Sequence, residues 1–138
     1  DIIVLARFFD PEGRRSLPHS TGVEQIRIAI ANLFASTAMD GQNQVVLTHE
    51  IMHTVGATDK YDFQSDLPLY PHGFARPEQR PLYPQRRAEL MAGRIPVSKG
   101  EARQADGLAQ VIIGPKTASE IGWLDDDSRE SAPTSTDR

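Results

Sequence analysis

The segment "THEIMHTVG", residues 48–56, constrains the fold of this chain most, because it predicts a helix with a defined end and two histidines on one face. The helix is predicted over residues 44–55, and Gly56 is the residue type that most often follows a helix C-terminus. Apolar residues occupy most of the helix circumference, which is typical of a helix buried within a domain. His49 and His53 are four residues apart, so their imidazoles lie one above the other and can bind the same ion.

Three further residues extend this histidine pair into a candidate catalytic zinc site. Gly56 can take the positive φ that lets the chain turn back, and Asp59 follows three residues later with a carboxylate that suits zinc. Glu50 is one step around the helix, where it can accept a proton from a metal-bound water without being a ligand. The segment therefore predicts one zinc ion held by His49, His53 and Asp59, with Glu50 as the general base.

The rest of the chain predicts an α+β domain over residues 1–123 and a disordered polar tail over residues 124–138. Residues 1–9 predict a largely buried strand, and the alternating residues 26–34 predict a half-buried one. Residues 62–88 contain five prolines and predict a long irregular loop, which in a compact domain is usually functional or disordered. Turns are predicted at 10–13 and 39–43, and short helices at 98–105, where Ser98 and Glu101 form a capping-box pattern, and at 114–123, where Trp123 is expected to be buried.

Composition excludes several other classes of protein. The 138 residues carry a net charge of −4, so no global positive field attracts nucleic acid. The chain has no cysteine, which excludes disulfides, thiolate zinc ligands and a thiol nucleophile. No apolar run approaches 18 residues, so neither a membrane span nor a signal peptide is expected within this sequence. Because it begins with Asp1 inside an apolar stretch, we interpret it as a fragment or a processed form, and its compartment and oligomeric state stay open.

The extended pattern H-E-x-x-H-x-x-G-x-x-D resembles the motif of the metzincin zinc endopeptidases, with Asp59 in place of their third histidine. It is most similar to the snapalysin-type peptidases, which have aspartate in that position and a nearby tyrosine, here Tyr61. The segment "AELMAGR", residues 88–94, resembles the methionine turn of these enzymes, with Met91 beneath the metal. The resemblance implies a small, twisted, mainly antiparallel or mixed sheet packed on an active-site helix. Metzincins usually have a backing helix and a strand before these elements, so we expect a domain truncated at its N-terminus.

The resemblance also assigns expected roles outside the motif. Residues 27–34 are the candidate edge strand that pairs with a peptide substrate, and the 62–88 loop is expected to shape the specificity pocket. For Tyr70, Phe74 and Tyr83 in that loop, ordinary packing is the preferred interpretation. Tyr61 is a candidate hydrogen-bond donor to the oxyanion of the reaction, or simply packs over the ligand loop. Arginines around the loop indicate either a preference for acidic substrates or, more commonly, a solvated face: Arg76, Arg80, Arg86, Arg87 and Arg94.

Two questions stay open at the level of sequence. The third ligand could instead be Glu89, as in zinc enzymes whose second helix supplies a glutamate, although "RIP" after it does not continue as a long helix. Asp62, His19 and His72 are weaker candidates. The zinc could also serve a non-catalytic binding module as a structural staple, but such a site has no use for Glu50. The expected function is therefore a zinc metalloendopeptidase that acts on a peptide or protein substrate, with Glu50 and Tyr61 as catalytic residues.

Overall fold

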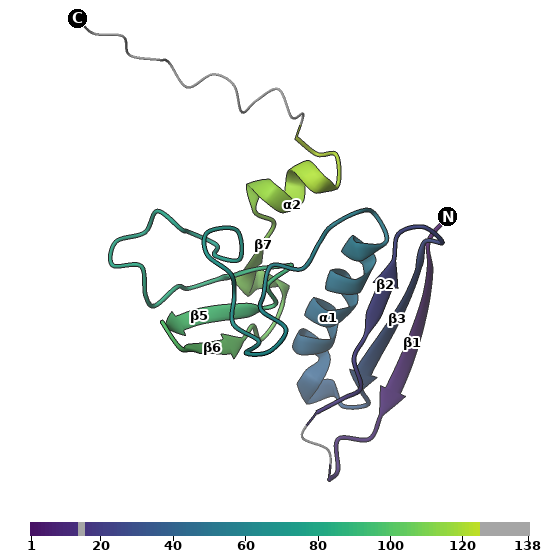
Figure 1. Ribbon diagram of the computed structural model, residues 1–138. Helices are drawn as coiled ribbons and strands as arrows, with labels where there is room; N and C mark the ends of the chain where they lie inside the picture. Colours follow the sequence, from purple (N-terminus) through teal and green to yellow (C-terminus); the bar gives the residue numbers. More distant parts are fainter. Residues whose placement is uncertain (14–15, 125–138) are drawn as a thin grey trace, which may run out of the picture.

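A computed structural model describes residues 1–13 and 16–124, which form a small α+β domain with mixed sheets (Figure 1). The predicted α+β class is confirmed, whereas the predicted tail over 124–138 lies outside the described residues except for Leu124. Among the described residues, no helix has the length and hydropathy needed to cross a membrane. The elements in chain order are β1 (Ile3–Phe9), β2 (Thr21–Val23), β3 (Ile28–Phe34), the 3₁₀ helix η1 (Thr37–Met39), α1 (Asp40–His53), β4 (Ala88–Glu89), β5 (Arg94–Ser98), β6 (Glu101–Gln104), η2 (Leu108–Gln110), β7 (Val111–Ile112) and α2 (Pro115–Glu120).

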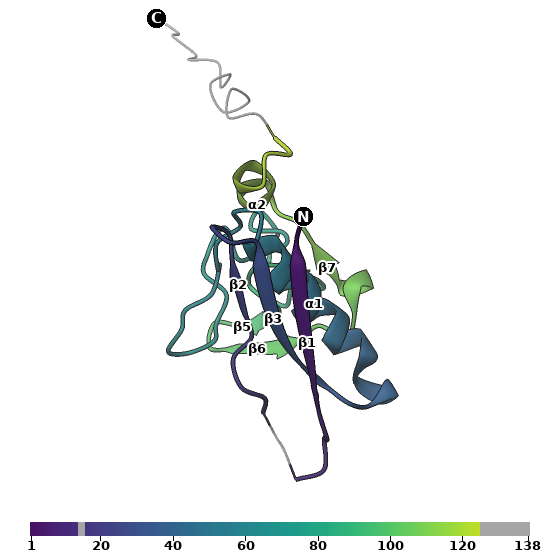
Figure 2. The same cartoon turned by 90° about the vertical axis from the view of Figure 1, so that its right-hand side faces the viewer.

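The first three strands form a mixed sheet in the order β1-β3-β2, with β1 parallel and β2 antiparallel to β3. Helix α1 runs along this sheet and separates it from the smaller strands of the second half (Figures 1 and 2). Ala29 and Ala31 of β3 are fully buried, and such small side chains let a helix approach a sheet closely. The strand predicted over 26–34 is therefore the central strand, and the expectation that it forms the substrate-binding edge is wrong. The edges of this sheet are β1 and β2. Strand β1 was predicted, whereas the short β2 was not.

Strand β1 has the predicted position in the chain but not the predicted burial. Ile3, Leu5 and Phe8 are each more than half exposed, at 54%, 52% and 63%. The reason is its place at the edge of the sheet, where β3 is its only strand neighbour. Apolar composition alone cannot distinguish such an edge from a strand covered on both sides.

Helix α1 starts at Asp40, within the predicted turn at 39–43, and ends as predicted before Gly56, whose φ is +103°. The first turn of this helix packs closely against Asp106, because a Cβ at Gly41 would lie 1.9 Å from the Asp106 carbonyl oxygen. Glycine, which indicates a turn in the sequence, is here required by close backbone contact. Val45, Leu90, Met91 and Ile95 belong to the principal core, which lies between α1 and the second half of the chain.

The second half contains the predicted loop and two small paired sheets. No helix or multi-residue strand interrupts residues 62–87, and β4 pairs with β7 in parallel while β5 and β6 form a hairpin. The helix predicted at 98–105 is wrong, because Ser98 and Glu101 face each other across the hairpin turn. The helix predicted at 114–123 exists as the shorter α2, but Trp123 lies beyond it and is 65% exposed, not buried.

Candidate metal centre

The end of α1 and the segment after it bring His49, His53 and Asp59 together as a group that could hold a metal ion. Asp59 Oδ1 lies 2.9 Å from His49 Nε2 and 3.1 Å from His53 Nε2, and the two Nε2 atoms are 3.0 Å apart. The positive φ of Gly56 reverses the chain after the helix, which returns Asp59 to the histidine face. The three predicted ligands thus form a small triangle of donor atoms.

The hydrogen bonds of the other imidazole nitrogens determine what this triangle can bind. His49 Nδ1 lies 3.0 Å from the Leu90 carbonyl oxygen, and His53 Nδ1 lies 2.8 Å from that of Ala57. A carbonyl only accepts, so each Nδ1 carries a proton, and a ring in its neutral form then presents a lone pair at Nε2. Two lone pairs and a carboxylate oxygen then face one another, an arrangement that either a proton or a metal ion shared among them would stabilise.

The size of the triangle is compatible with a transition-metal ion. Ligand atoms around a tetrahedral ion with bonds of about 2.1 Å lie about 3.4 Å from one another. The separations of 2.9, 3.0 and 3.1 Å therefore need only a small expansion to accept such an ion. Two imidazoles and one carboxylate are a donor set that suits zinc and related divalent ions.

The electrostatics of the metal-free group agree with this geometry. Burial opposes ionisation of Asp59, but hydrogen bonds from His49 and His53 lower the pKa of its carboxyl group well below the usual value. Burial alone would lower the pKa of His53, yet the hydrogen bond and negative charge of Asp59 more than offset it and raise that pKa. The group therefore holds a negative carboxylate that attracts a proton or a metal ion.

Glu50 is a buried carboxylate with one oxygen that no other group of the described chain contacts by a hydrogen bond. Its side chain is only 7% exposed, and its Oε2 atom is buried without a hydrogen-bond partner. Burial raises the pKa of this carboxyl group, and the nearby histidines only partly oppose the shift. A buried carboxylate with an unused oxygen is costly, so it calls for a ligand or water that the chain itself does not supply.

An open cavity of about 1180 Å³ contains the candidate ligands and Glu50. Strand β2 borders it through Thr21 and Gly22. A Cβ at Gly22 would lie 2.3 Å from the Glu50 carbonyl oxygen and 2.7 Å from His53 Cβ, so β2 rests directly on α1 at the metal group. The free edge of β2 thus lies beside the site.

Four other residues were candidates for this site, and only two of them, Tyr61 and His19, line the cavity. Tyr61 lines it, with its ring centroid 6.4 Å from that of His49, and burial followed by the charge of Asp59 raises its pKa to about 12. His19 also lines the cavity but is not in the metal-binding group. Asp62 and His72 are not among the lining residues. Of these candidates, Tyr61 therefore combines a position in the cavity with a phenol that stays protonated at neutral pH.

Met91 lies in a buried turn that contacts the metal group through its backbone. The Met91 side chain is fully buried in the core, and Gly93 closes the turn with a φ of +71°. The Leu90 carbonyl accepts the hydrogen bond from His49, and the Met91 carbonyl accepts one from the Lys60 amide at 2.9 Å. Glu89 is not part of the metal-binding group, because both its oxygens accept hydrogen bonds elsewhere.

The carboxylate of Glu120, at the end of α2, forms hydrogen bonds and an ion pair with the residues on either side of Asp59. Thr58 donates to it from its amide at 3.0 Å and from its hydroxyl at 2.9 Å. Lys60 Nζ, on the other side of Asp59, lies 2.7 Å from Glu120 and is buried. Neither Glu120 nor Lys60 could be predicted from the sequence, because no local pattern connects residues sixty positions apart.

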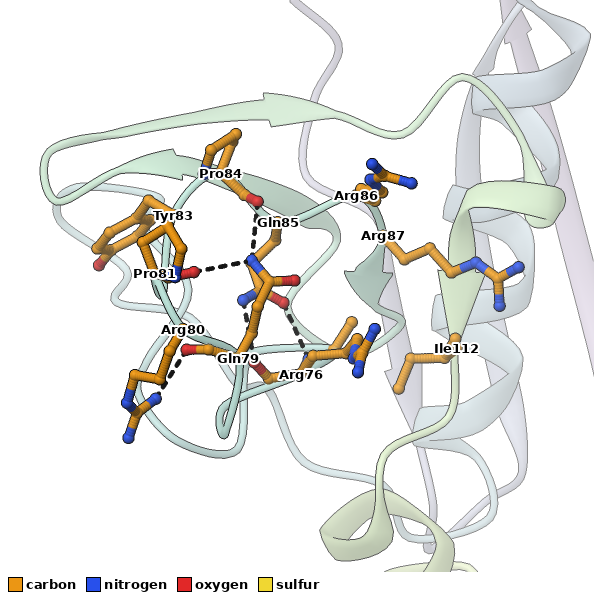
Figure 3. A pocket seen from close by; sticks show the side chains of 11 residues that line it. Arg76, Gln79, Arg80, Pro81, Tyr83, Pro84, Gln85, Arg86, Arg87 and Ile112 are labelled. Carbon is orange, nitrogen blue, oxygen red and sulfur yellow. Dashed lines mark hydrogen bonds between the residues drawn. The ribbon is translucent and has the colours of Figure 1, made fainter.

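The arginines of the long loop lie around a separate open cavity of about 740 Å³ (Figure 3). Glutamine side chains fix this loop, since Gln85 is buried and bonds the backbone of Arg76 and Leu82. The lining of this second cavity shares no residue with the lining of the metal cavity. Of the five arginines named above, only Arg94 lines the metal cavity. Tyr70, Phe74 and Tyr83 do not line the metal cavity either, and their rings pack edge to face at 5.5 and 5.8 Å as ordinary loop packing predicts.

No protein-family model matches this chain, and no curated protein or solved structure shows significant similarity to it.

Proposed function

We propose that this domain is a zinc-dependent endopeptidase of the metzincin type. The observation that carries the proposal is the convergence of two imidazole lone pairs and one carboxylate oxygen beside the unpartnered, buried Oε2 of Glu50. His49, His53 and Asp59 would hold the ion. Two imidazoles and a carboxylate suit zinc, and the pattern H-E-x-x-H-x-x-G-x-x-D, which departs from the metzincin motif only at Asp59, supplies all of these residues.

Zinc, when bound, supplies an electrophilic centre that acidifies water and polarises a peptide carbonyl. Glu50 takes the proton from the attacking water and later delivers it to the leaving amine. Burial raises the pKa of Glu50, which makes its carboxylate a stronger base than an exposed one. The Tyr61 hydroxyl stays protonated and donates a hydrogen bond to the developing oxyanion.

The substrate is proposed to bind as an extended strand along β2. This strand has a free edge, borders the cavity and touches α1 at Glu50 and His53. Backbone pairing along such an edge binds many sequences and aligns a peptide bond with the metal group. A peptide or protein substrate fits this edge better than a small molecule, which has no row of backbone groups to pair.

A non-catalytic domain in which zinc serves only as a staple is the second candidate. It shares the three metal ligands but gives no role to the unpaired oxygen of Glu50. The two candidates therefore differ in what Glu50 does, and a substitution at this residue separates them.

The decisive experiment replaces Glu50 by glutamine. We expect E50Q to keep one zinc per chain and its thermal stability, but to cleave a mixed peptide library about 10²–10⁴-fold more slowly than the unmodified chain, because the base is lost. Zinc content is measured by mass spectrometry and cleavage by product analysis.

The matched control is E101Q, since Glu101 is an exposed residue of β6. It should cleave as fast as the unmodified chain. If the unmodified chain holds one zinc and cleaves no peptide in the library, the endopeptidase proposal fails and the zinc-stapled domain replaces it.

A further inference from the structure

Glu89 is a fully buried carboxylate whose oxygens accept four hydrogen bonds. Oε2 accepts from the amides of Met91 at 2.6 Å and Ala92 at 3.2 Å, and Oε1 from the Gly114 amide at 3.1 Å and the Thr117 hydroxyl at 2.6 Å. Among the described residues, no cation forms an ion pair with it. A buried, unneutralised carboxylate is expensive to maintain, so its bonds to the methionine turn call for an explanation.

The amide that Glu89 binds most closely belongs to the same peptide group as the carbonyl that holds His49. The Met91 N–H donates to Glu89, and the Leu90 C=O of that planar group accepts from His49 Nδ1 at 3.0 Å. A negative charge on the N–H side polarises the group and makes its carbonyl oxygen a stronger acceptor. The carboxylate therefore acts on the imidazole through one rigid peptide unit.

His53 has the same arrangement, built from a different part of the chain. His53 Nδ1 donates to the Ala57 carbonyl at 2.8 Å, and the N–H of that peptide group, from Thr58, donates to Glu120 Oε2 at 3.0 Å. We call each arrangement a carboxylate–peptide–histidine bridge. One bridge joins Glu89 to His49 through Leu90–Met91, and the other joins Glu120 to His53 through Ala57–Thr58.

The neighbouring peptide group extends the first bridge toward the third ligand. The Ala92 N–H also donates to Glu89, and the Met91 carbonyl of the same peptide group accepts from the Lys60 amide at 2.9 Å. Lys60 follows Asp59 directly, so Glu89 also restrains the backbone beside the carboxylate ligand.

We propose that Glu89 and Glu120 are positioning residues for the metal centre, each orienting one histidine ligand and strengthening its donor nitrogen through a single peptide group. The inference rests on the metal site of the proposed function. In many metal sites the second nitrogen of a ligating histidine meets a carboxylate directly, which fixes the tautomer and raises its basicity. Here a peptide group stands between the two, so the carboxylate stays buried behind the backbone.

Two single substitutions test the bridges separately. Glutamine at 89 or 120 keeps the shape, but removes the charge and turns one acceptor atom into an NH₂ donor that faces N–H groups. Loss of such support usually weakens metal binding about 10–100-fold, so we expect E89Q and E120Q each to bind zinc that much less tightly. Affinity is measured by competition with a chromophoric chelator.

Nuclear magnetic resonance distinguishes positioning from a general loss of stability. With ¹⁵N-labelled histidine, E89Q should shift the Nδ1–H signal of His49 and leave that of His53 in place, and E120Q should do the reverse. Thr117→Val and Lys116→Gln are the controls, because they remove other contacts of Glu89 and Glu120 but keep the peptide bridges. Both controls should bind zinc within about twofold of the unmodified chain, since their histidine supports are intact.

Unchanged zinc affinity in both glutamine variants, or histidine signals that move together in each, would overturn the inference. If E89Q fails to fold, E120Q decides, because Glu120 lies at the end of α2 and outside the core. The histidine signals can also be compared in metal-free protein. If the unmodified chain binds no zinc, the proposed function is rejected, and the histidine signals of the metal-free variants alone then confirm or overturn the bridges.

Discussion

At the scale of single residues, the proposed ligands and the proposed base differ in which of their polar atoms have hydrogen-bond partners within the protein. His49 and His53 use one nitrogen each on backbone carbonyls, so the other nitrogen is available to an ion. Glu89 uses both oxygens within the protein, whereas Glu50 leaves Oε2 unused. Two buried glutamates thus have opposite roles, one supporting the backbone and one facing the cavity.

Tyr61 is the residue whose proposed role can be tested apart from metal binding. Tyr61→Phe removes the hydroxyl and keeps the ring that packs against Phe63 at 5.1 Å. Loss of one oxyanion donor costs about 10²–10³-fold in turnover, so we expect kcat to fall by that factor while zinc affinity changes little. Steady-state kinetics and chelator competition on the same preparation measure the two effects.

Phe63→Leu is the comparison, because it changes the neighbouring ring without touching the hydroxyl. Its kcat should stay close to that of the unmodified chain. Equal turnover in Y61F and the unmodified chain would show that Tyr61 only packs over the ligand segment.

At the scale of elements, the site depends on how closely β2 rests on α1. Gly22 has no side chain at the point where the strand crosses the helix, and the nearest atoms belong to Glu50 and His53. The strand therefore lies against the two residues that bear the proposed chemistry. The backbone edge that would receive a substrate is held at a fixed distance from them.

The substitution Gly22→Ala should force strand β2 away from helix α1 and destabilise the fold. An added Cβ would be 2.3 Å from the Glu50 carbonyl oxygen, which is backbone and cannot rotate away. Overpacking of this kind costs about 1–3 kcal/mol, so we expect the midpoint of urea unfolding to fall accordingly. Gly100→Ala, with no atom within 4 Å of its added Cβ, should unfold at the original midpoint. Equal midpoints for the two variants would mean that β2 does not rest on α1 as described.

At the scale of the whole molecule, the metal group joins segments that are distant in the sequence. Helix α1, the segment after it, the turn at Met91 and α2 meet at one place through hydrogen bonds from His49, Lys60 and Thr58. The core beside this point contains few large side chains that are fully buried, among them Leu90, Met91 and Ile95. An ion bound there should therefore stabilise the fold as a whole.

Removal of zinc should lower the melting temperature. Ligand at about 1,000 times its Kd stabilises a protein by about 4 kcal/mol, which corresponds to roughly 10 °C or more in a domain of this size. Calorimetry with excess zinc and with a chelator measures the shift. Asp59→Asn weakens the site by removing a charged ligand, so its melting temperature should respond far less to zinc. A melting temperature independent of zinc in the unmodified chain, at full occupancy, would contradict this expectation.

The sequence by itself determined the residues of the candidate site, because helical spacing places His49 and His53 on one face and Gly56 permits the return to Asp59. It also predicted the strand over β3, the long proline-rich loop and the α+β class. It failed where one pattern fits two structures: Ser98 and Glu101 are spaced for a capping box and equally for facing positions across a two-residue hairpin turn.

Only the tertiary structure decided how the elements surround that site. Strand order made β3 central and placed β1 and the three-residue β2 at the edges, and the sequence of β2 carries no strand pattern that could have predicted this. Glu89 lies in the core, where this candidate ligand instead accepts hydrogen bonds from the turn at Met91. Glu120 accepts a hydrogen bond from Thr58, sixty-two residues away in the sequence. Local spacing fixes which side chains share a helix face, whereas contacts between distant segments depend on packing, which no local pattern records.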